Sequence, residues 1–484
     1  MFSSIQLFEE QGIKNLRKVE NKFIETKDIA SFVNDVKTEA LNLAMNIIAE
    51  TLERYNEEIR ESAKRKEHWN IIRTDTKSLI TSIGTINFEK TFFINKDTGE
   101  RAYLLDRELG IEDHQRITED AEAQLLKEAV QTTYKKGGEA VSILDKVSKT
   151  TTMDKIRNLD FSKVHKVPEK LREVPYLYID ADEDHVSLQF HQKKGDLKKN
   201  TYGRKDNCVL AKMVYVYEGI EPESPKSTRH KLIHPHYFCG VYDGKDNEKL
   251  WQEVYDYLEE TYDLSKVKKV YLNSDGGAWI NGAKKRLSGL TRVLDEFHMN
   301  KYMLKITGGL LDSADEVRED LMHEIRRGTM ESFANKVLPI ANVAPSESAA
   351  TRIIDSANYI LHNWTAARAR LCHDEHRIGC SAEGHVSHVL SDRMSSRPLG
   401  WCRDGANQMA HLRAYYFNDG DMLELVKAQK LPKAAGAEDR IIIDTNKLGE
   451  KIYKEWGKYV DRANHEVSVL GQKYAWFKAQ ITHI

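Results

Sequence analysis

The chain has 484 residues, of which 40% are hydrophobic and 31% charged, and its formal net charge at pH 7 is −2. This length predicts about three domains in a folded, soluble protein, and the near-neutral charge argues against a protein that only coats nucleic acid, because such proteins carry an overall basic excess. No run approaches the roughly 20 apolar residues that a membrane span requires, residues 1–25 lack an apolar signal segment, and five dispersed cysteines do not make a disulfide framework, so we expect a cytoplasmic protein.

Residues 5–67 are predicted to be helical, because apolar residues recur at intervals of three or four in this region: Phe32, Val36, Ala40, Leu43 and Ile47. The next segment alternates apolar and polar residues between Ile83 and Ile94, which is typical of a β strand. The stretch NKDTGE then supplies a hairpin turn at Gly99. Four basic side chains lead into this small β element: Lys64, Arg65, Lys66 and Arg73.

Three helices are predicted between residues 117 and 159. The first begins after Thr118 and is stopped by Gly137 and Gly138, the second covers residues 139–147, and the third begins at Ser148. A short helix, a tight turn and a further helix is the spacing of a helix-turn-helix motif. The last helix would offer four side chains to a DNA groove or to phosphates: Lys149, Thr150, Thr151 and Lys155. An ordinary three-helix packing unit remains the alternative.

Residues 174–300 are predicted to form a mixed α/β sheet covered by helices. The predicted strands cover the runs VPYLYI, HVSLQF, NCVLAKMVYVYEGI, KVKKVYLNS and LTRVLDEFHM. One predicted helix covers NEKLWQEVYDYLEETY between the third and fourth strands, and a second lies between the fourth and fifth strands. Residues 301–370 have a wholly helical pattern, and residues 401–484 form a polar, mostly helical tail.

Two acids, Asp180 and Asp275, follow predicted strands directly. Strand ends of open α/β sheets are where ligands bind, because side chains there leave a buried support for a crevice. Gly276 and Gly277 would let the chain turn without crowding the second carboxylate. The alternative for each acid is a cap of the turn that follows.

A third acid, Glu383, lies in the stretch CSAEGHVSHVLSDRMSSRP. Ser381 is a good N-cap, which places Glu383 in the first turn of a helix, where favourable interaction with the helix dipole is the alternative explanation. Arg393 and Arg397 follow where phosphates could be gripped. Three carboxylates suit Mg²⁺ or Mn²⁺, and two such ions about 4 Å apart support in-line attack on a phosphodiester.

A structural zinc site is a competing hypothesis for the same region, because six possible ligands lie close together: Cys372, His373, His376, Cys380, His385 and His388. Their spacing is poor, since no paired CxxC and no HExxH motif is present. We therefore favour the magnesium interpretation.

The motifs YLYIDADEDHVSLQ, VYLNSDGGAWI, VLDEFHMNKYM and GCSAEGHVSHVLSDRMSSRPLGW together resemble the ISLre-type insertion-sequence transposases, which belong with the Mutator-like DDE transposases. The resemblance implies a ribonuclease H-like core interrupted by a helical insertion, with Asp180, Asp275 and Glu383 as the catalytic acids. Asp182 is a rival for the first position, and Asp180 is preferred because it directly follows the apolar run. Asp295 and His298 match an accessory pair of these enzymes.

The resemblance implies a transposase that binds terminal inverted repeats and uses two Mg²⁺ or Mn²⁺ ions to cut double-stranded DNA and join it to target DNA. The helix-turn-helix and the KRK segment would bind the repeats, and a homo-oligomer on DNA in the nucleoid is expected because two ends must be joined. The alternatives are a DNA-binding regulator with a ligand-sensing α/β domain, and a nuclease of the same fold that does not join.

The expected domains follow the elements and the resemblance together. They are an N-terminal helical and β-hairpin region (1–110), a helix-turn-helix DNA-binding region (111–165), the first part of the core (166–300), the helical insertion (301–370), the third-acid helix of the core (371–400) and the helical tail (401–484).

Overall fold

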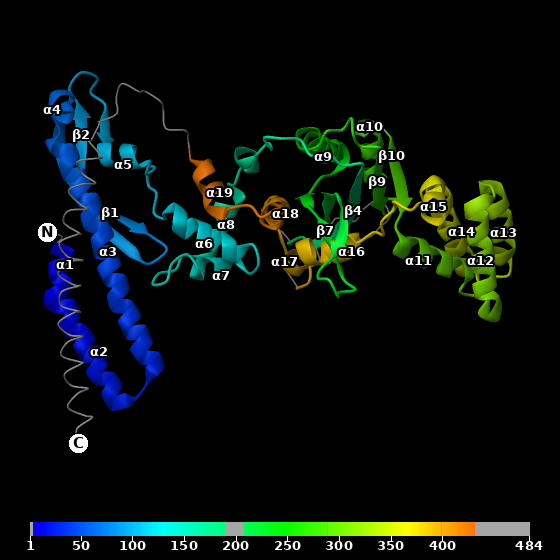
Figure 1. Cartoon of the computed structure of the whole chain (residues 1–484), viewed down its shortest axis with the longest axis horizontal. Coiled ribbons are helices and arrows are strands. Elements are labelled where there is room, and N and C mark those ends of the chain that lie inside the picture. Colours follow the sequence, from blue (N-terminus) through cyan, green and yellow to red (C-terminus); the bar gives the residue numbers. More distant parts are fainter. Residues whose placement is uncertain (1–2, 190–207, 288, 398, 431–484) are drawn as a thin grey trace. The chain divides into compact units, whose positions relative to one another are not determined.

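The computed structural model describes residues 3–189, 208–287, 289–397 and 399–430 (Figure 1). These residues form two compact units, the first comprising 3–124, 139–146 and Lys430, and the second 125–138 with the described part of 147–429. None of the helices in the described ranges has the length and apolar character needed to cross a membrane. Residues 431–484, most of the predicted tail, lie outside the described residues.

The first unit begins with helices over the predicted region, which confirms that expectation. They are α1 (Ser3–Leu7), the π-helical turn η1 (Phe8–Gly12), α2 (Ile13–Thr26), α3 (Ile29–Glu61) and α4 (Ala63–His68). Between α2 and α3 the chain reverses at Lys27, which has a left-handed φ of 55°, and Asp28 caps α3 by accepting a hydrogen bond of 3.1 Å from the backbone N–H of Ser31. The result is the long helical hairpin seen in Figure 1.

The predicted β element is a three-stranded antiparallel sheet in the order β1-β2-β3. Its strands are β1 (Trp69–Ile80), β2 (Thr85–Asn95) and β3 (Arg101–Tyr103), followed by α5 (Leu104–Leu109). Gly99 has a φ of 74° in the predicted turn. Side chains of the sheet, including Phe88 and Phe93, are buried against Ile59 and other residues of α3.

Three helices are present between residues 117 and 159, but the second lies elsewhere than predicted. They are α6 (Glu119–Ala129), which crosses from the first unit into the second, α7 (Tyr134–Glu139) and α8 (Lys149–Arg157). Gly137 and Gly138 do not end a helix but are buried inside α7. A Cβ at Gly138 would lie 2.4 Å from the carbonyl oxygen of Val147, so this glycine permits close packing.

The second unit contains a five-stranded mixed sheet in the order β10-β9-β4-β5-β8. The strands are β4 (Tyr176–Ser187), β5 (Cys208–Tyr217), β8 (His236–Gly240), β9 (Lys269–Ser274) and β10 (Leu290–Leu294), and a separate hairpin is formed by β6 (Gly219–Pro222) and β7 (His230–Ile233). β4 and β8 are each antiparallel to β5, whereas β9 is parallel to β4 and β10 is parallel to β9. The predicted mixed α/β class is confirmed.

Three details of the predicted sheet were wrong. The two strands expected on either side of the DADED acids are one strand, because β4 stays paired with β5 from Tyr178 to Ser187. β8 was not predicted, since its five residues are too few to show a period. The last predicted strand ends at Leu294, because Asp295 begins helix α11.

The two faces of the five-stranded sheet differ in chemistry. One face is apolar and packs on α9 (Asn247–Thr261), with Leu177 and Ile179 of β4 in the same cluster as Trp251 and Val254 of the helix. The opposite face carries buried tyrosines and is covered by residues 374–401: the tyrosines are Tyr178, Tyr215, Tyr217, Tyr237 and Tyr271. Figure 1 shows α9 and α16 on opposite sides of β4.

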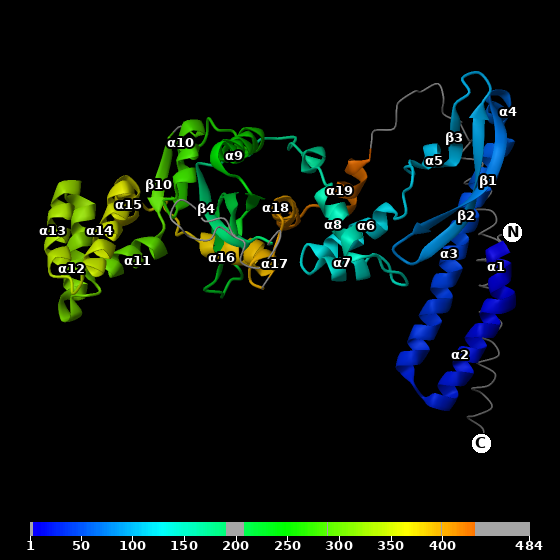
Figure 2. The ribbon, with the colours of Figure 1, turned by 180° about the vertical axis from the view of Figure 1, so that it is seen from behind.

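The region predicted to be wholly helical is helical and has its own core, in which Leu321, Phe333 and Ile360 are completely buried. Its helices are α11 (Glu296–Thr307), α12 (Ala314–Arg327), α13 (Met330–Asn342), α14 (Glu347–His362) and α15 (Trp364–Leu371). Figure 2 shows α12 to α14 side by side, beyond the β10 edge of the sheet, with α15 against β10.

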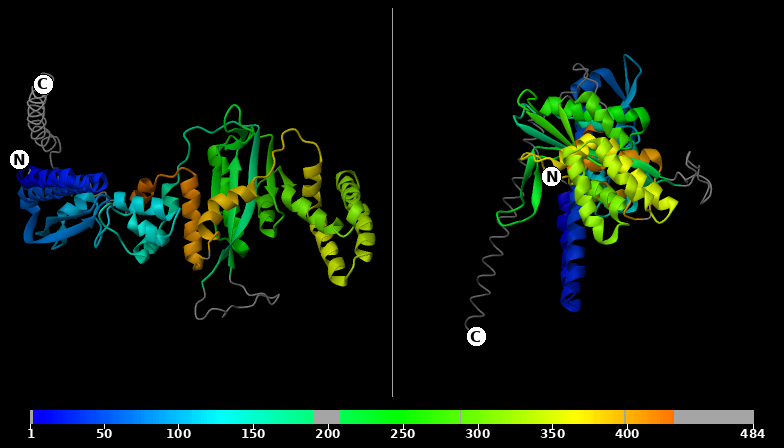
Figure 3. Two further views of the ribbon diagram at one scale, coloured as in Figure 1. Left: turned by 90° about the horizontal axis from the view of Figure 1, so that it is seen from below. Right: turned by 90° about the vertical axis from the view of Figure 1, so that its right-hand side faces the viewer.

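The predicted third-acid helix is present and contains a π-helical turn. It consists of α16 (Ala382–Val386), the π turn η6 (Ser387–Ser391) and α17 (Asp392–Met394), and two helices follow it: α18 (Arg403–Phe417) and α19 (Met422–Gln429). Helix α18 packs against β8, at the other edge of the sheet from α15 (Figure 3). The short elements that remain are η2 (Phe161–Val164), η3 (Gly244–Asp246), η4 (Ala278–Gly282), α10 (Ala283–Arg286) and η5 (Leu311–Ser313).

Candidate active site

Two acids lie next to each other where the pairing of the neighbouring strands β4 and β9 ends. In this parallel pair Asp180 is in register with Asn273, and Ala181 with Ser274, so the next residue of each strand is Asp182 and Asp275. Asp275 directly follows the last residue of β9, at the carboxyl end of a buried strand. Side chains in that position open into a crevice at the sheet edge. The register therefore brings Asp182, the rival first acid, next to the second acid.

The carboxyl group of Asp182 has an elevated pKa. Burial, with a smaller contribution from the negative charge of Asp275, raises this pKa to about 6. The backbone N–H of Glu183, which donates to Asp182 Oδ1 at 2.8 Å, and the nearby His298 act in the opposite direction. A half-buried carboxyl beside a second carboxylate lacks a compensating positive charge, and a bound cation would supply that charge.

The predicted accessory pair lies at the same place. His298 Nδ1 is 3.0 Å from Asp295 Oδ2, and Asp295 also caps α11 by accepting a hydrogen bond of 3.2 Å from the His298 backbone N–H. The hydrogen bond to Asp295, together with the charges of Asp275 and Asp182, raises the pKa of His298. The pair thus holds an imidazole, with its protonated form favoured, close to the two acids.

The loop after Asp275 needs glycine, as the sequence indicated. Gly276 has a φ of 88°, in the left-handed region, and a Cβ there would lie 2.6 Å from Asn363 Oδ1. Asn363 is itself fixed, because its amide donates to the Tyr359 carbonyl oxygen at 3.0 Å. The backbone N–H of Gly277 donates to Asp275 Oδ1 at 2.9 Å, which orients the carboxylate.

Replacing Gly276 by alanine should lower the free energy of unfolding by about 2–3 kcal/mol, from backbone strain plus a clash. Gly244 is the matched control in the same unit, because its φ of 54° is also left-handed and nothing lies within 4 Å of its Cβ position. Urea unfolding of Gly276→Ala and Gly244→Ala separates strain from clash. Equal losses would show that Asn363 does not constrain the loop.

Asp180, the preferred first acid from the sequence, is sealed inside the protein. Its side chain has no exposed surface, and each of its oxygens accepts two hydrogen bonds. Oδ1 accepts from Asn273 at 2.8 Å and from Tyr217 at 3.2 Å. Oδ2 accepts from Tyr215 at 2.7 Å and from the Ser381 backbone N–H at 3.0 Å. Burial raises the pKa of this carboxyl, and these hydrogen bonds oppose the rise. The geometry therefore favours Asp182 as the first acid and gives Asp180 a structural task.

That task is to fasten the chain segment that carries Glu383. In Figure 3 (left) the yellow segment leading into α16 crosses the sheet. Side chains of successive strands hold it: Tyr271 donates to Asp374, Tyr178 to the His376 carbonyl oxygen, and Tyr237 lies 2.9 Å from His385 Nδ1. Ser381 does not cap α16 as predicted, because its hydroxyl lies 2.8 Å from the Tyr215 hydroxyl instead.

Glu383 is exposed in the first turn of α16, on the face of the sheet that carries Asp182. Among the described residues, no hydrogen bond or ion pair holds its carboxylate. The structure thus places the helix that carries Glu383 over the same face of the sheet as Asp182.

Of the two arginines predicted to grip phosphate, Arg393 is buried, and that prediction was wrong. Its Nε donates to the Ala129 carbonyl oxygen at 3.0 Å, and its guanidinium lies 4.9 Å from the Trp401 ring centroid. These contacts join α17 to α6 and leave no surface for a ligand. Arg397 is exposed.

The predicted DNA-binding residues have varied surroundings. Lys149 and Thr150 are exposed at the start of α8, Thr151 and Lys155 are partly buried, and Ser148 caps this helix. In the first unit Lys64 is partly buried, Lys66 pairs with Glu61 and Arg73 with Asp75 at the surface. Arg65 is buried and lies over the Phe93 ring, so its predicted contact with DNA was wrong.

In the part of the chain that the structure describes, no three histidine, cysteine, aspartate or glutamate side chains converge as a ready metal site. Among these described residues, neither the six zinc candidates nor the three predicted acids form such a cluster. Asp182 and Asp275 nevertheless fit a Mg²⁺ or Mn²⁺ ion in donor type and charge, since both are oxygen ligands at one sheet edge. The buried Oε2 atom of the adjacent Glu183 has no hydrogen-bond partner in these ranges.

The raised pKa of Asp182 makes a prediction about stability in metal-free buffer. The pKa is 3.8 ordinarily and about 6 in the fold, so ionisation costs stability as pH rises through this interval. Asp182→Asn should therefore be more stable than wild type by on the order of 1–3 kcal/mol at about pH 8, and equal to it at about pH 4. Urea unfolding at both pH values measures the difference, and a gain that does not depend on pH would contradict the assignment.

Two further residues at this site were missed from the sequence. Arg292 of β10 is half-buried near Asp275, and its Nη1 donates to Asn281 Oδ1 at 2.9 Å. The hydroxyl of Tyr359 donates to the Asp275 carbonyl oxygen. An arginine in the middle of the run LTRVL was a usable signal, because charged residues are rare in buried strands. Tyr359 is 84 residues from Asp275 and gave no signal.

A family model described as "Uncharacterised protein family (UPF0236)" matches residues 24–430. Two curated relatives from Caldanaerobacter subterraneus subsp. tengcongensis, both called UPF0236 proteins, are similar over nearly the whole chain. The first is 33% identical over 91% of this chain and 87% of its own length, and the second is 32% identical over 95% of this chain and 90% of its own. Their names carry eleven and four locus designations, so the family has many paralogues in one genome.

Among solved structures, the Drosophila P element transposase strand transfer complex aligns with 64% of this chain and 82% of its own. The sequence identity is 10% and the TM-score is 0.19. A score that low does not establish a common fold.

Proposed function

We propose that this chain, which belongs to the uncharacterised protein family UPF0236, is a DDE transposase of a bacterial insertion sequence. It binds terminal inverted repeats and catalyses metal-dependent cleavage of double-stranded DNA and joining of the cut end to target DNA. The observation that carries the proposal is the pair Asp182 and Asp275, which lie next to each other where the pairing of the parallel strands β4 and β9 ends. The many paralogues in one genome support a mobile element.

The sheet supports the proposal through its order and strand directions. Three antiparallel strands, β4, β5 and β8, are followed along the chain by two strands that extend the sheet in parallel from β4. We interpret this as a ribonuclease H-like core, with the helices α11 to α15 as the insertion before the third acid.

The residues take the following roles in the proposal. Asp182 and Asp275 would hold the divalent cations, and Glu383 would complete the site when its side chain turns inward. Two bound cations supply an activated attacking oxygen and stabilise the oxygen that leaves the phosphodiester. His298, oriented by Asp295, can donate a hydrogen bond to phosphate. Asp180 is a positioning residue, because it fixes Ser381 two residues before Glu383.

The test uses short duplexes built from the inverted repeats that flank the gene, a plasmid target, and Mg²⁺, Mn²⁺ or a chelator. We expect metal-dependent cleavage at the repeat end and joining to the plasmid, both lost in Glu383→Gln. Cleavage without joining would instead indicate a nuclease. Binding without any metal-dependent chemistry, and equal in the variant, would contradict the proposal and favour a DNA-binding regulator.

A further inference from the structure

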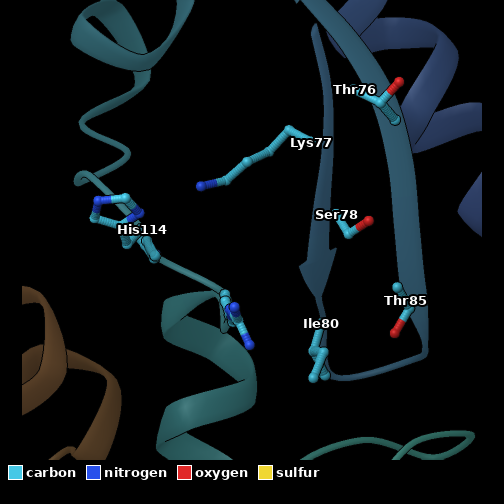
Figure 4. Close-up of a pocket in the computed structure, with 8 residues that line it drawn as sticks. Thr76, Lys77, Ser78, Ile80, Thr85 and His114 are labelled. Carbon is cyan, nitrogen blue, oxygen red and sulfur yellow. The ribbon is translucent and has the colours of Figure 1, made fainter.

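The first unit contains a pocket of about 510 Å³ between β1 and residues 114–116 (Figure 4). Its polar lining consists of three basic side chains, three hydroxyl groups and one amide: Lys77, His114, Arg116, Thr76, Ser78, Thr85 and Gln115. In Figure 4 the ammonium group of Lys77 extends across the pocket toward the ring of His114. Lys77 on one wall and the basic side chains of His114 and Arg116 on the other are suited to an anion between them.

The backbone holds the two walls in a fixed relation. The Ile80 N–H donates to the Arg116 carbonyl oxygen at 2.8 Å, and the Thr118 N–H donates to the Ile80 carbonyl oxygen at 3.0 Å. The amide of Gln115 also donates to the Ile117 carbonyl oxygen at 2.9 Å. His114 has a left-handed φ of 59°, which is unusual for a residue with a side chain. The basic groups are therefore presented by an ordered frame.

The cations of the pocket lack anionic partners. Within the described ranges, neither Lys77 nor Arg116 has an ion-pair partner, and Lys77 is half-buried. Of the nearby acids, Asp106 is paired with Lys90, Asp145 accepts a hydrogen bond of 2.8 Å from the Thr85 hydroxyl, and Asp113 is exposed. Burial, with the charges of Lys90 and Arg116, lowers the pKa of Lys77. A half-buried ammonium in such surroundings gains free energy when an anion enters.

We propose that this pocket binds a backbone phosphate of double-stranded DNA, which Lys77 and Arg116 neutralise. The inference rests on the proposed function, which supplies the DNA, and adds a site that the basic segment at residues 64–66 did not predict. The cationic groups contact phosphate oxygens without reading bases, so the pocket should bind all duplex sequences alike. Exposed Arg116 and His114 can reach a phosphate that belongs to a long polymer.

The test measures binding of a short labelled duplex to the full chain over a range of KCl concentrations, without divalent metal. Each neutralised phosphate contact contributes about 0.9 to the slope of log affinity against log salt. Because both cations act on one phosphate, the double variant should lower the slope by about 0.9, and Lys77→Gln and Arg116→Gln should each lower it by part of that amount. Each single variant should weaken binding about 3- to 10-fold at moderate salt. Lys77→Arg should keep the wild-type slope because it keeps the charge.

Lys37→Gln is the matched control, since Lys37 is exposed on α3 of the same unit and has no partner among the described residues. Arg116 is exposed, so its substitution does not threaten folding. Variants that bind like wild type and Lys37→Gln would overturn the pocket while leaving the transposase proposal intact. Pocket-dependent binding without metal-dependent cleavage would support the pocket and overturn the transposase. A wild-type protein that does not bind duplex DNA would overturn both.

Discussion

Asp182→Asn and Asp275→Asn should each reduce metal-dependent DNA cleavage and joining by at least about 10³-fold, while binding of the repeat duplex persists. Each substitution removes an anionic oxygen ligand and keeps the size of the side chain. The loss is in chemistry rather than in folding, because Asp182 is destabilising when ionised. Removing negative charge near the DNA can also tighten binding.

Asp184→Asn is the matched control for this experiment. Asp184 lies two residues beyond Asp182 on the same face of β4, but it pairs in register with Ala211 of β5 and accepts a hydrogen bond of 2.7 Å from the Ser395 hydroxyl. Asp184 is three residues past Ala181, the last residue of β4 that pairs with β9, whereas Asp182 directly follows Ala181, so we expect near wild-type activity. Full activity of Asp182→Asn, or equal losses at all three positions, would refute the assignment of the site.

Metal dependence gives the same assignment an independent readout. Cysteine is a soft ligand that Mg²⁺ accepts poorly and Mn²⁺ accepts better. Asp182→Cys should therefore be inactive with Mg²⁺ and regain part of its cleavage with Mn²⁺. Asp180→Cys should show no such recovery, because its position is enclosed by four hydrogen-bond donors. Recovery at Asp180 instead of Asp182 would return the first-acid role to Asp180.

Asp180→Ala should lower the free energy of unfolding by about 3–5 kcal/mol, the largest stability effect that we expect from one substitution in the sheet. Truncation leaves the hydroxyls of Tyr215 and Tyr217, the amide of Asn273 and the N–H of Ser381 buried without their acceptor. Each unpaired buried donor costs free energy, and the lost volume adds a cavity. Urea unfolding followed by tryptophan fluorescence measures the change.

Asp184→Ala is again the control, because Asp184 is only partly buried and accepts a single side-chain hydrogen bond, from Ser395. Asp180→Asn should cost less than Asp180→Ala, since the amide retains one acceptor. If Asp180 acts through Glu383, Asp180→Asn should weaken Mn²⁺ binding in wild type but not in Glu383→Gln. Equal weakening in both backgrounds would restrict Asp180 to stability, and wild type that binds no Mn²⁺ would contradict the metal site itself.

The sequence by itself determined the local elements and the candidate residues. Period and turn residues were sufficient for the helices of residues 3–68, for the turn at Gly99 and for the strand that ends before Asp275. Local patterns act over a few residues, and these elements depend on little else. The pair Asp295 and His298 was found for the same reason, since one turn of helix brings them into contact.

Only the tertiary structure decided which acid of DADED stands beside Asp275, because strand register is set by long-range pairing and not by the apolar run that precedes the acids. It likewise enclosed Asp180 with hydrogen-bond donors from three other segments. It also buried Arg393 and Arg65, although their charge alone had suggested that they lie at the surface. The amino-acid sequence shows which residues can ionise. Burial and hydrogen bonding, which need residues distant in sequence, decide which of them meet a ligand.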